Sequence, residues 1–285
     1  MHDFIYHTPN LLEEALSILS EHGERAIPIA GGTALVNLMK QNLIMANHLV
    51  DLKNLTHLRT ITHQSGNLHV GALTTHSELG NNTLIKKCIP LVADAYQRVA
   101  TIRIRNAATI GGGLVHSDPA QDPPPALMVS NAYVSLTSLD GTRQLPVADL
   151  FVDYYQSALK AGELLTELVV PIQEPDVRTS YLQFLPRTKD DYATVTVAAI
   201  GRVVDGQCHD IKVALGSVGP TPVRATAVES LLLGKNISTC LVNKAAETVV
   251  EQIDPLTDFR GSAAYKRDMA VVFTRRALRE VLNLY

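Results

Sequence analysis

The stretch "RNAATIGGGLVHSDPAQDPPPAL", residues 105–127, places three consecutive glycines directly after Thr109 and Ile110. Glycine has no Cβ and tolerates positive φ, so a turn of this kind can direct successive main-chain N–H groups toward an anion. Asp118 and Asp122 follow among four prolines. A carboxylate at such a place can accept hydrogen bonds from sugar hydroxyls, but an aspartate in a proline-rich loop is more often a turn or cap residue. The residues alone leave both interpretations open.

A second stretch, "IAGGTAL" at residues 29–35, repeats the design of a predicted strand end, adjacent glycines and a hydroxyl side chain. Two such turns, carrying Thr33 and Thr109, suit a diphosphate better than a single phosphate. Neither stretch matches GxGxxG followed by a helix, nor GxxxxGK[ST], so a Rossmann dinucleotide site and a P-loop are both disfavoured. The predicted ligand is therefore a diphosphate bound between two separate glycine-rich turns.

The composition excludes several classes of function. The chain has 285 residues, a net charge of -3 and no run of more than two Lys or Arg, which argues against nucleic-acid binding. Its apolar runs are far shorter than the roughly 20 residues of a membrane span, and residues 1–10 do not resemble a secretory signal, so we expect a cytoplasmic protein. The three cysteines are too far apart for an iron–sulfur or zinc site. We predict no metal site and no catalytic side chain, so any redox centre is an organic cofactor or belongs to a partner.

The periodicity of apolar residues predicts an α/β beginning and a sheet backed by helices at the end. Residues 10–23 form a predicted helix, with Thr8 as its N-cap, Pro9 at its first position and Gly23 as its end. Three consecutive antiparallel strands are expected in the second half, and the proline-bearing segment 171–180 is the predicted domain boundary. Further helices are expected over residues 84–100, 238–253 and 262–284, and further strands over 26–32, 48–52, 67–73, 132–138, 142–150 and 163–171.

At this point the chain resembles a known family. "IPIAGGTALVNLMKQ" (27–41) and the segment 104–127 look like the FAD-binding subunit of the molybdenum hydroxylases, the group of the xanthine dehydrogenase and carbon monoxide dehydrogenase medium chains. Segments 214–234 and 258–278 resemble the C-terminal domain of the same family, so the resemblance extends over the whole chain. It implies an α+β fold with a PCMH-type (vanillyl-alcohol-oxidase-type) FAD-binding domain at 1–174, made of two α/β subdomains at about 1–56 and 57–174. A C-terminal domain at 178–285, with a three-stranded antiparallel sheet and helices, would follow.

The resemblance also implies which residues contact FAD, and two positions depart from the family pattern. Gly113 stands where Asn or Ser is commoner, and Gln183 stands where Lys is frequent. The implied acid that meets the polyol chain of the flavin is Asp122, and Tyr192 would cover a face of the ring. The complete implied set is Ile29, Ala30, Gly31, Gly32, Thr33, Ala34, Thr109, Ile110, Gly111, Gly112, Gly113, Ser117, Asp122, Leu168 and Tyr192.

The function implied by the resemblance is electron transfer. FAD in this chain would receive electrons from [2Fe–2S] clusters in a small subunit and deliver them to an external acceptor. Molybdopterin would be confined to a large subunit, and the complex would be a dimer of heterotrimers. Two alternatives stay open: a free-standing FAD-dependent oxidoreductase of the PCMH group, and a scaffold subunit that has lost FAD.

Overall fold

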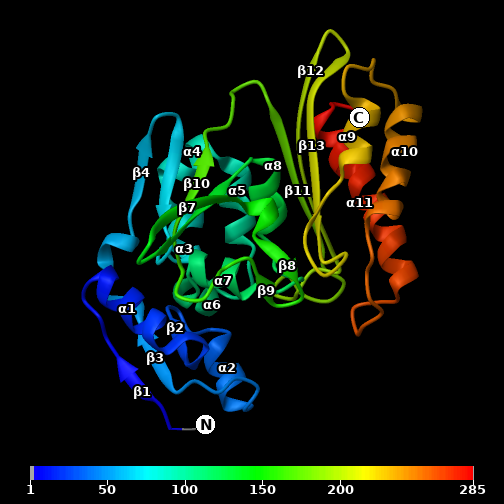
Figure 1. The fold of residues 1–285 in the computed structure, drawn as a ribbon. Coiled ribbons are helices and arrows are strands. Elements are labelled where there is room, and N and C mark those ends of the chain that lie inside the picture. Colours follow the sequence, from blue (N-terminus) through cyan, green and yellow to red (C-terminus); the bar gives the residue numbers. More distant parts are fainter. Residues whose placement is uncertain (1–2, 285) are drawn as a thin grey trace.

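The computed structural model describes residues 3–284, which form three lobes in chain order (Figure 1). The N-terminal lobe is drawn in blue, the central lobe runs from cyan to green, and the C-terminal lobe runs from yellow to red. Parallel strands are confined to the first lobe, and the other sheets are antiparallel. The predicted α+β class is confirmed, because both helices and strands contribute to every lobe.

The N-terminal lobe is a three-stranded parallel sheet in the order β1-β3-β2, with two helices. Its core consists mainly of Ala15, Leu16 and Leu19 packed on Val50 and Leu55. The helix ends at Gly23, whose φ of 53° fits glycine, as the sequence predicted. The elements are β1 (Ile5–His7), α1 (Leu12–His22), β2 (Ala26–Ile29), α2 (Leu35–Lys40) and β3 (His48–Asp51).

The predicted start of the first helix is wrong. The helix begins at Leu12 with Leu11 as N-cap, and not with Thr8 and Pro9. The carboxylate of Glu14 accepts hydrogen bonds from the main-chain N–H groups of Asn10 (2.9 Å) and Leu11 (3.3 Å). The acid of the first turn therefore satisfies the free N–H groups that a threonine cap would have bound.

A five-stranded antiparallel sheet, in the order β4-β5-β10-β6-β7, forms the centre of the second lobe. Helices pack on it around the largest apolar core of the molecule. The strands are β4 (Ile61–Gln64), β5 (Asn67–Gly71), β6 (Tyr133–Ser138), β7 (Gly141–Pro146) and β10 (Leu164–Pro171), with a small hairpin of β8 (Phe151–Asp153) and β9 (Gln156–Ser157). The helices are α3 (His76–Asn81), α4 (Thr83–Cys88), α5 (Pro90–Gln97), α6 (Ile102–Ala107), α7 (Ile110–His116) and α8 (Pro124–Val129).

The C-terminal lobe contains four antiparallel strands, which corrects the predicted three. The additional strand, β14, has only two residues, Val223 and Arg224, too few to show an alternating pattern in the sequence. One face of this sheet packs on the C-terminal helices, and residues of the other face join the core of the central lobe. The elements are β11 (Arg178–Phe184), β12 (Val195–Val204), β13 (Gln207–Gly216), β14 (Val223–Arg224), α9 (Thr226–Leu232), α10 (Thr239–Glu247) and α11 (Ala263–Val281).

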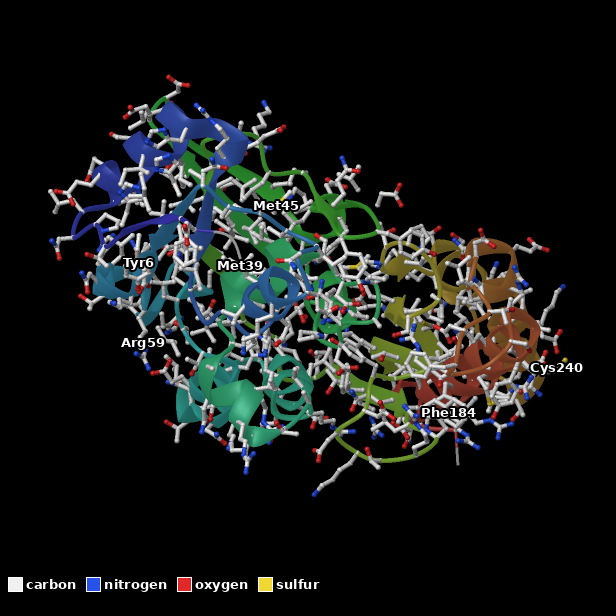
Figure 2. The ribbon with its side chains drawn as sticks, turned by 90° about the horizontal axis from the view of Figure 1, so that it is seen from below. Tyr6, Met39, Met45, Arg59, Phe184 and Cys240 are labelled. Atoms are coloured by element: carbon white, nitrogen blue, oxygen red, sulfur yellow. The ribbon has the colours of Figure 1, made fainter. Side chains whose placement is uncertain are left out.

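The cysteines are dispersed over the fold. Cys88, Cys208 and Cys240 are free and lie in different elements; Cys240 is exposed at the outer edge of the C-terminal lobe (Figure 2). Within residues 3–284, no helix has the length and apolar character needed to cross a bilayer. The described part of the chain also contains no group of three metal-ligating side chains.

Candidate functional site

The first glycine turn connects β2 to α2 and keeps its N–H groups free. Gly32 has a φ of 68°, a conformation that side-chain-bearing residues rarely adopt. Among residues 3–284, no acceptor is bound by the main-chain N–H groups of Gly31, Gly32, Thr33 or Ala34. Four successive unpaired donors beside a bare backbone are suited to an anion.

The two glycine segments lie against each other, although more than seventy residues separate them in the sequence. A Cβ built on Gly31 would stand 1.9 Å from the carbonyl oxygen of Ala107 and 3.0 Å from the Cα of Ala108. Ala107 and Ala108 lead directly into the second glycine segment. Only glycine permits this approach at position 31, so the N-terminal and central lobes are in main-chain contact at this point.

The second glycine segment is the first turn of helix α7, which corrects the predicted turn after a strand. Thr109 is its N-cap, and its hydroxyl accepts a hydrogen bond from the N–H of Gly112 (3.3 Å). The N–H of Gly111 donates to Ala72 (2.9 Å) and that of Gly113 to the carbonyl of Thr109 (2.9 Å). None of the three glycines has a positive φ. These N–H groups are therefore already used within the protein, unlike those of the first turn.

What the second segment contributes is an open surface. A Cβ added to Gly112 would meet nothing within 4 Å except the Thr109 hydroxyl oxygen at 2.9 Å. By contrast, a Cβ on Gly111 would press on the Cβ of Ala72 at 2.8 Å. Gly111 is thus needed for packing, whereas Gly112 leaves room for a ligand. The hydroxyl proton of Thr109 stays available, since that hydroxyl acts as an acceptor toward Gly112.

Three further residues implied by the resemblance have no exposed side chain. Ile110 and Leu168 are fully buried in the central core, and Leu168 pairs with Val70 and Val134 on the neighbouring strands. Ser117 is 2% exposed, ends α7 in the left-handed conformation, and its hydroxyl donates to the carbonyl of Leu114. These side chains are buried in the central lobe, and contact of the three residues with FAD stays a prediction.

Asp122 is a buried carboxyl group at the junction of the central and C-terminal lobes. The residue is 4% exposed, and its Oδ1 accepts a hydrogen bond from the Thr196 hydroxyl at 3.3 Å. Its main-chain carbonyl accepts a hydrogen bond from the Tyr181 hydroxyl at 2.9 Å. Burial raises the pKa of Asp122 to about 7, although the nearby polar side chains of Gln183 and Thr196 act in the opposite direction. A carboxyl group kept here at this cost to stability has the character of a functional group.

The environment of Asp122 also contains polar atoms without partners. Gln183 faces the carboxyl group, yet its Nε2 donates no hydrogen bond within residues 3–284, and neither does the buried Nε2 of Gln121. Buried polar groups are nearly always hydrogen-bonded. A ligand with several hydroxyl groups would satisfy these donors and the carboxyl oxygens, so the polyol chain of FAD fits the residues present.

Tyr192 lies beside this region and is 51% exposed. Burial of part of the side chain raises the pKa of its phenol, and the Asp118 carboxylate adds to the effect. Tyr155 is a further candidate site residue that the sequence analysis did not identify. It is 59% exposed, and its ring packs on that of His116 with 5.3 Å between the centroids. Its main-chain N–H donates to the carbonyl of Ser117. Two adjacent tyrosines in the polar turn "VDYYQ" (152–156) were the available signal.

Two arginines near the candidate site are engaged in other contacts. The guanidinium of Arg105 donates to the carbonyls of Val99 (2.7 Å) and Ala100 (2.5 Å), so it stabilises the segment that precedes α6. Arg187 forms an ion pair with Asp191 at 2.6 Å and lies over the ring of Phe259. Neither cation is free to replace the lysine that the family often has in place of Gln183.

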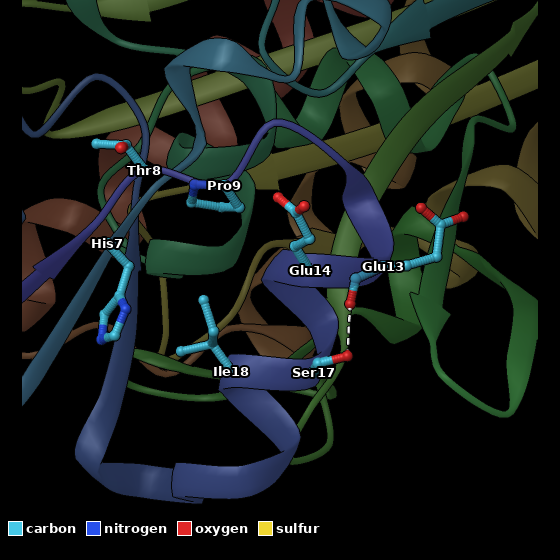
Figure 3. Close-up of a pocket in the computed structure, with 7 residues that line it drawn as sticks. All are labelled: His7, Thr8, Pro9, Glu13, Glu14, Ser17 and Ile18. Carbon is cyan, nitrogen blue, oxygen red and sulfur yellow. Dashed lines mark hydrogen bonds between the residues drawn. The ribbon is translucent and has the colours of Figure 1, made fainter.

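The two described surface hollows lie elsewhere. One, of about 560 Å³, is formed by the strand-to-helix segment His7–Pro9 and by helix α1 (Figure 3). The other, of about 350 Å³, lies between the β12–β13 turn and the end of α11. No residue of the two glycine segments lines either hollow. The candidate site is therefore defined by main-chain geometry and buried polar groups.

Comparison with known families divides the chain into two matching parts. Residues 2–173 match the FAD binding domain in molybdopterin dehydrogenase. Residues 180–281 match the CO dehydrogenase flavoprotein C-terminal domain. Together the two matches include both glycine segments, Asp122 and Tyr192.

Individual relatives match over nearly their full length. The chain is 33% identical to the glyceraldehyde dehydrogenase medium chain of Sulfolobus acidocaldarius, over 98% of both chains. It is 32% identical to the carbon monoxide dehydrogenase medium chain of Hydrogenophaga pseudoflava, over 96% of both. A solved structure of that organism's carbon monoxide dehydrogenase superposes with a TM-score of 0.96 at 32% identity, covering 99% of this chain and 98% of the other. Quinoline 2-oxidoreductase from Pseudomonas putida 86 gives 0.93 at 30% identity, with coverage of 99% and 98%.

Proposed function

Because the chain belongs to the FAD-binding medium subunits of the molybdopterin dehydrogenases, of the carbon monoxide and xanthine dehydrogenase type, we propose that it is an electron-transfer subunit. FAD held by this chain receives electrons from [2Fe–2S] clusters of a small partner subunit and passes them to an external acceptor. A molybdopterin-binding large subunit oxidises the substrate. The proposed assembly is a dimer of such heterotrimers, and the proposed domains are 1–174 and 178–285.

The observation that carries this proposal is the contact between the two glycine segments. The free N–H groups of residues 31–34 and the open surface at Gly112 come together because Gly31 lies on Ala107. A diphosphate bound there accepts hydrogen bonds from the first turn and from the hydroxyls of Thr33 and Thr109. The same contact places the main chain of Ile29, Ala30 and Ala34 along one side of the proposed site.

The remaining residues provide for the polyol chain and the ring. Asp122 would accept hydrogen bonds from hydroxyl groups of the polyol chain, and the side-chain amide of Gln183 would donate a hydrogen bond to the same chain. Tyr192, which is half exposed, covers one face of the isoalloxazine. FAD supplies the ability to accept two electrons and release them singly or in pairs, while the protein fixes its position and excludes water from the diphosphate. No side chain of this protein has to transfer a proton.

An experiment on the purified full-length chain tests the proposal. We expect the chain to bind FAD stoichiometrically and to show an oxidised-flavin absorbance spectrum. Together with its large and small partner subunits, the flavin should be reduced when substrate is added, and the chain alone should leave that substrate unchanged. Substrate turnover by the isolated flavoprotein would favour a free-standing oxidoreductase instead. A folded chain that cannot be reconstituted with FAD would favour a scaffold subunit.

A further inference from the structure

The absence of a side chain at position 113 is explained by a neighbour from another segment. A Cβ built on Gly113 would stand 3.2 Å from Nε2 and 3.5 Å from Cε1 of the His76 imidazole. Few real Cβ contacts are as short as the first of these distances. The remaining atoms of a longer side chain would need still more of the volume that the imidazole fills. A side chain at position 113 would therefore compete with the His76 imidazole for the same volume.

The His76 ring is buried and packed on one side, which limits how far it can move. His76 is 6% exposed, and its main-chain N–H donates to the carbonyl of Ala108 at 3.0 Å. The ring meets the edge of the buried Tyr96 ring at 5.0 Å between centroids. It is the first residue of α3, behind the capping box that Thr75 forms with Glu78. The backbone and one face of the ring are thus fixed by packing.

The start of α7 lies next to the ring, because Nε2 and Cε1 are the atoms nearest to a Cβ built on Gly113. The carbonyl of Thr109, the residue that caps α7, accepts the N–H of Gly113 at 2.9 Å. Desolvation lowers the pKa of His76 to about 4, so the imidazole is neutral at physiological pH. Its Nδ1 is buried and has no partner within the described residues. A buried neutral imidazole with one unpaired nitrogen costs stability, which a purely apolar side chain would avoid.

We propose that His76 is a positioning residue of the cofactor site, and that it and Gly113 form a compensating pair. The imidazole fills the volume that an Asn or Ser side chain at position 113 would need, and thereby holds the first turn of α7, with Gly112 and Thr109, in the position that a diphosphate requires. This inference rests on the proposed binding of FAD. It implies that a side chain at position 113 weakens FAD binding in this protein only while the imidazole is present.

A double-mutant cycle tests the pair. FAD is titrated into the FAD-free full-length chain, with flavin fluorescence as the readout, for wild type, Gly113→Asn, His76→Ser and the double variant. We expect Gly113→Asn to raise the Kd for FAD about 10- to 100-fold, His76→Ser about 3-fold, and the double variant to bind at least 5-fold more tightly than Gly113→Asn. Gly112→Asn with and without His76→Ser is the matched control, because the Cβ of residue 112 does not approach His76. His76→Ser should give no recovery there.

The possible outcomes are distinct. If the wild-type chain does not bind FAD, the proposed function fails. If it does bind FAD, and Gly113→Asn binds equally well or the double variant shows no recovery, the pairing alone is wrong. Should Gly113→Asn not fold, Gly113→Ala adds only the Cβ at 3.2 Å; recovery of its FAD affinity by His76→Ser supports the pair, and additive effects overturn it. General loss of stability cannot produce recovery by a second truncating substitution.

Discussion

Replacement of Asp122 by Asn should stabilise the FAD-free protein while weakening its binding of FAD. The carboxyl group is buried, with the Thr196 hydroxyl at 3.3 Å as its one short side-chain partner. Its pKa is raised from 3.8 to about 7 in the folded protein. An unfolded chain releases this proton near pH 3.8, whereas the folded chain retains it up to about pH 7. The folded state therefore binds more protons in this range, and stability falls as the pH rises through it.

The magnitude follows from the difference of about three pH units between the two pKa values. At 1.36 kcal/mol per unit, a charged Asp122 costs at most roughly 4 kcal/mol of unfolding free energy above pH 7. Asn retains the shape and one acceptor but carries no charge, so part of this cost is recovered. We expect Asp122→Asn to raise the free energy of unfolding at pH 8 by roughly 1 to 3 kcal/mol, and to change it little at pH 4.

FAD binding should respond in the opposite direction. Loss of a charge-assisted hydrogen bond from a polyol hydroxyl costs about 1.5 to 3 kcal/mol, or about a 10- to 150-fold higher Kd. The assay is thermal unfolding from pH 4 to 8, with and without FAD, together with fluorescence titration of the cofactor. Asp118→Asn is the control, because Asp118 lies in the same loop but is partly exposed. A lower melting temperature for Asp122→Asn at pH 8 with unchanged FAD affinity would refute this reasoning.

Three further substitutions or conditions test other parts of the site. Gly32→Val should abolish FAD binding, since Gly32 has a φ of 68° and a Cβ there would meet Ile29 and Val36 at 3.2 Å; equilibrium dialysis measures the loss, and binding at wild-type affinity would contradict the assignment of the first turn. Gly31→Ala should lower the unfolding free energy by about 1 to 3 kcal/mol and reduce flavin content, because the added methyl group overlaps the neighbouring lobe; a stable, fully flavinated variant would show that the contact is dispensable. As the pH falls from 6.5 to about 4, the unfolded chain protonates His76 and the folded chain does not, so up to roughly 3 kcal/mol of stability should be lost. Denaturant titrations of wild type and His76→Asn at pH 7 and 4.5 measure this, and an equal loss in both proteins would argue against it.

The sequence predicted the strands of five or more residues, because their signals are local, and missed the shorter β1, β4, β8 and β9. Alternating and continuous apolar runs bounded by Gly and Pro located the hairpin β6–β7 and the strands β10 to β13. Pro90 also divides the predicted helix over 84–100 into α4 and α5, since proline removes a main-chain donor. At the other extreme, β14 is too short to carry a pattern, and its pairing with β13 is fixed only by the folded chain.

The features that the sequence did not reveal depend on contacts between distant segments. Residues 111–113 were predicted as a turn because glycine tolerates positive φ, yet the Thr109 cap and the hydrogen bond from Gly111 to Ala72 fix them as helical. Three other features also depend on segments that are distant in the sequence. They are the contact of Gly31 with Ala107, the burial of Asp122 against the C-terminal sheet and the approach of His76 to Gly113. Residue type suggested that these positions were special, but only the tertiary structure shows the reason.

The separation of the apolar cores affects how firmly the first lobe is held to the rest of the subunit. In the described part of the chain, the apolar core of residues 3–58 includes only Leu164 as a buried residue from beyond them, and the partly buried Leu73 packs on it. Few apolar side chains are shared between the first and the central lobe. A ligand that binds both glycine segments would therefore stabilise the contact between these two lobes. Without it, the first lobe should open more often and expose its linker near residue 59 to proteases. We therefore expect the chain with bound FAD to resist proteolysis better than the FAD-free chain.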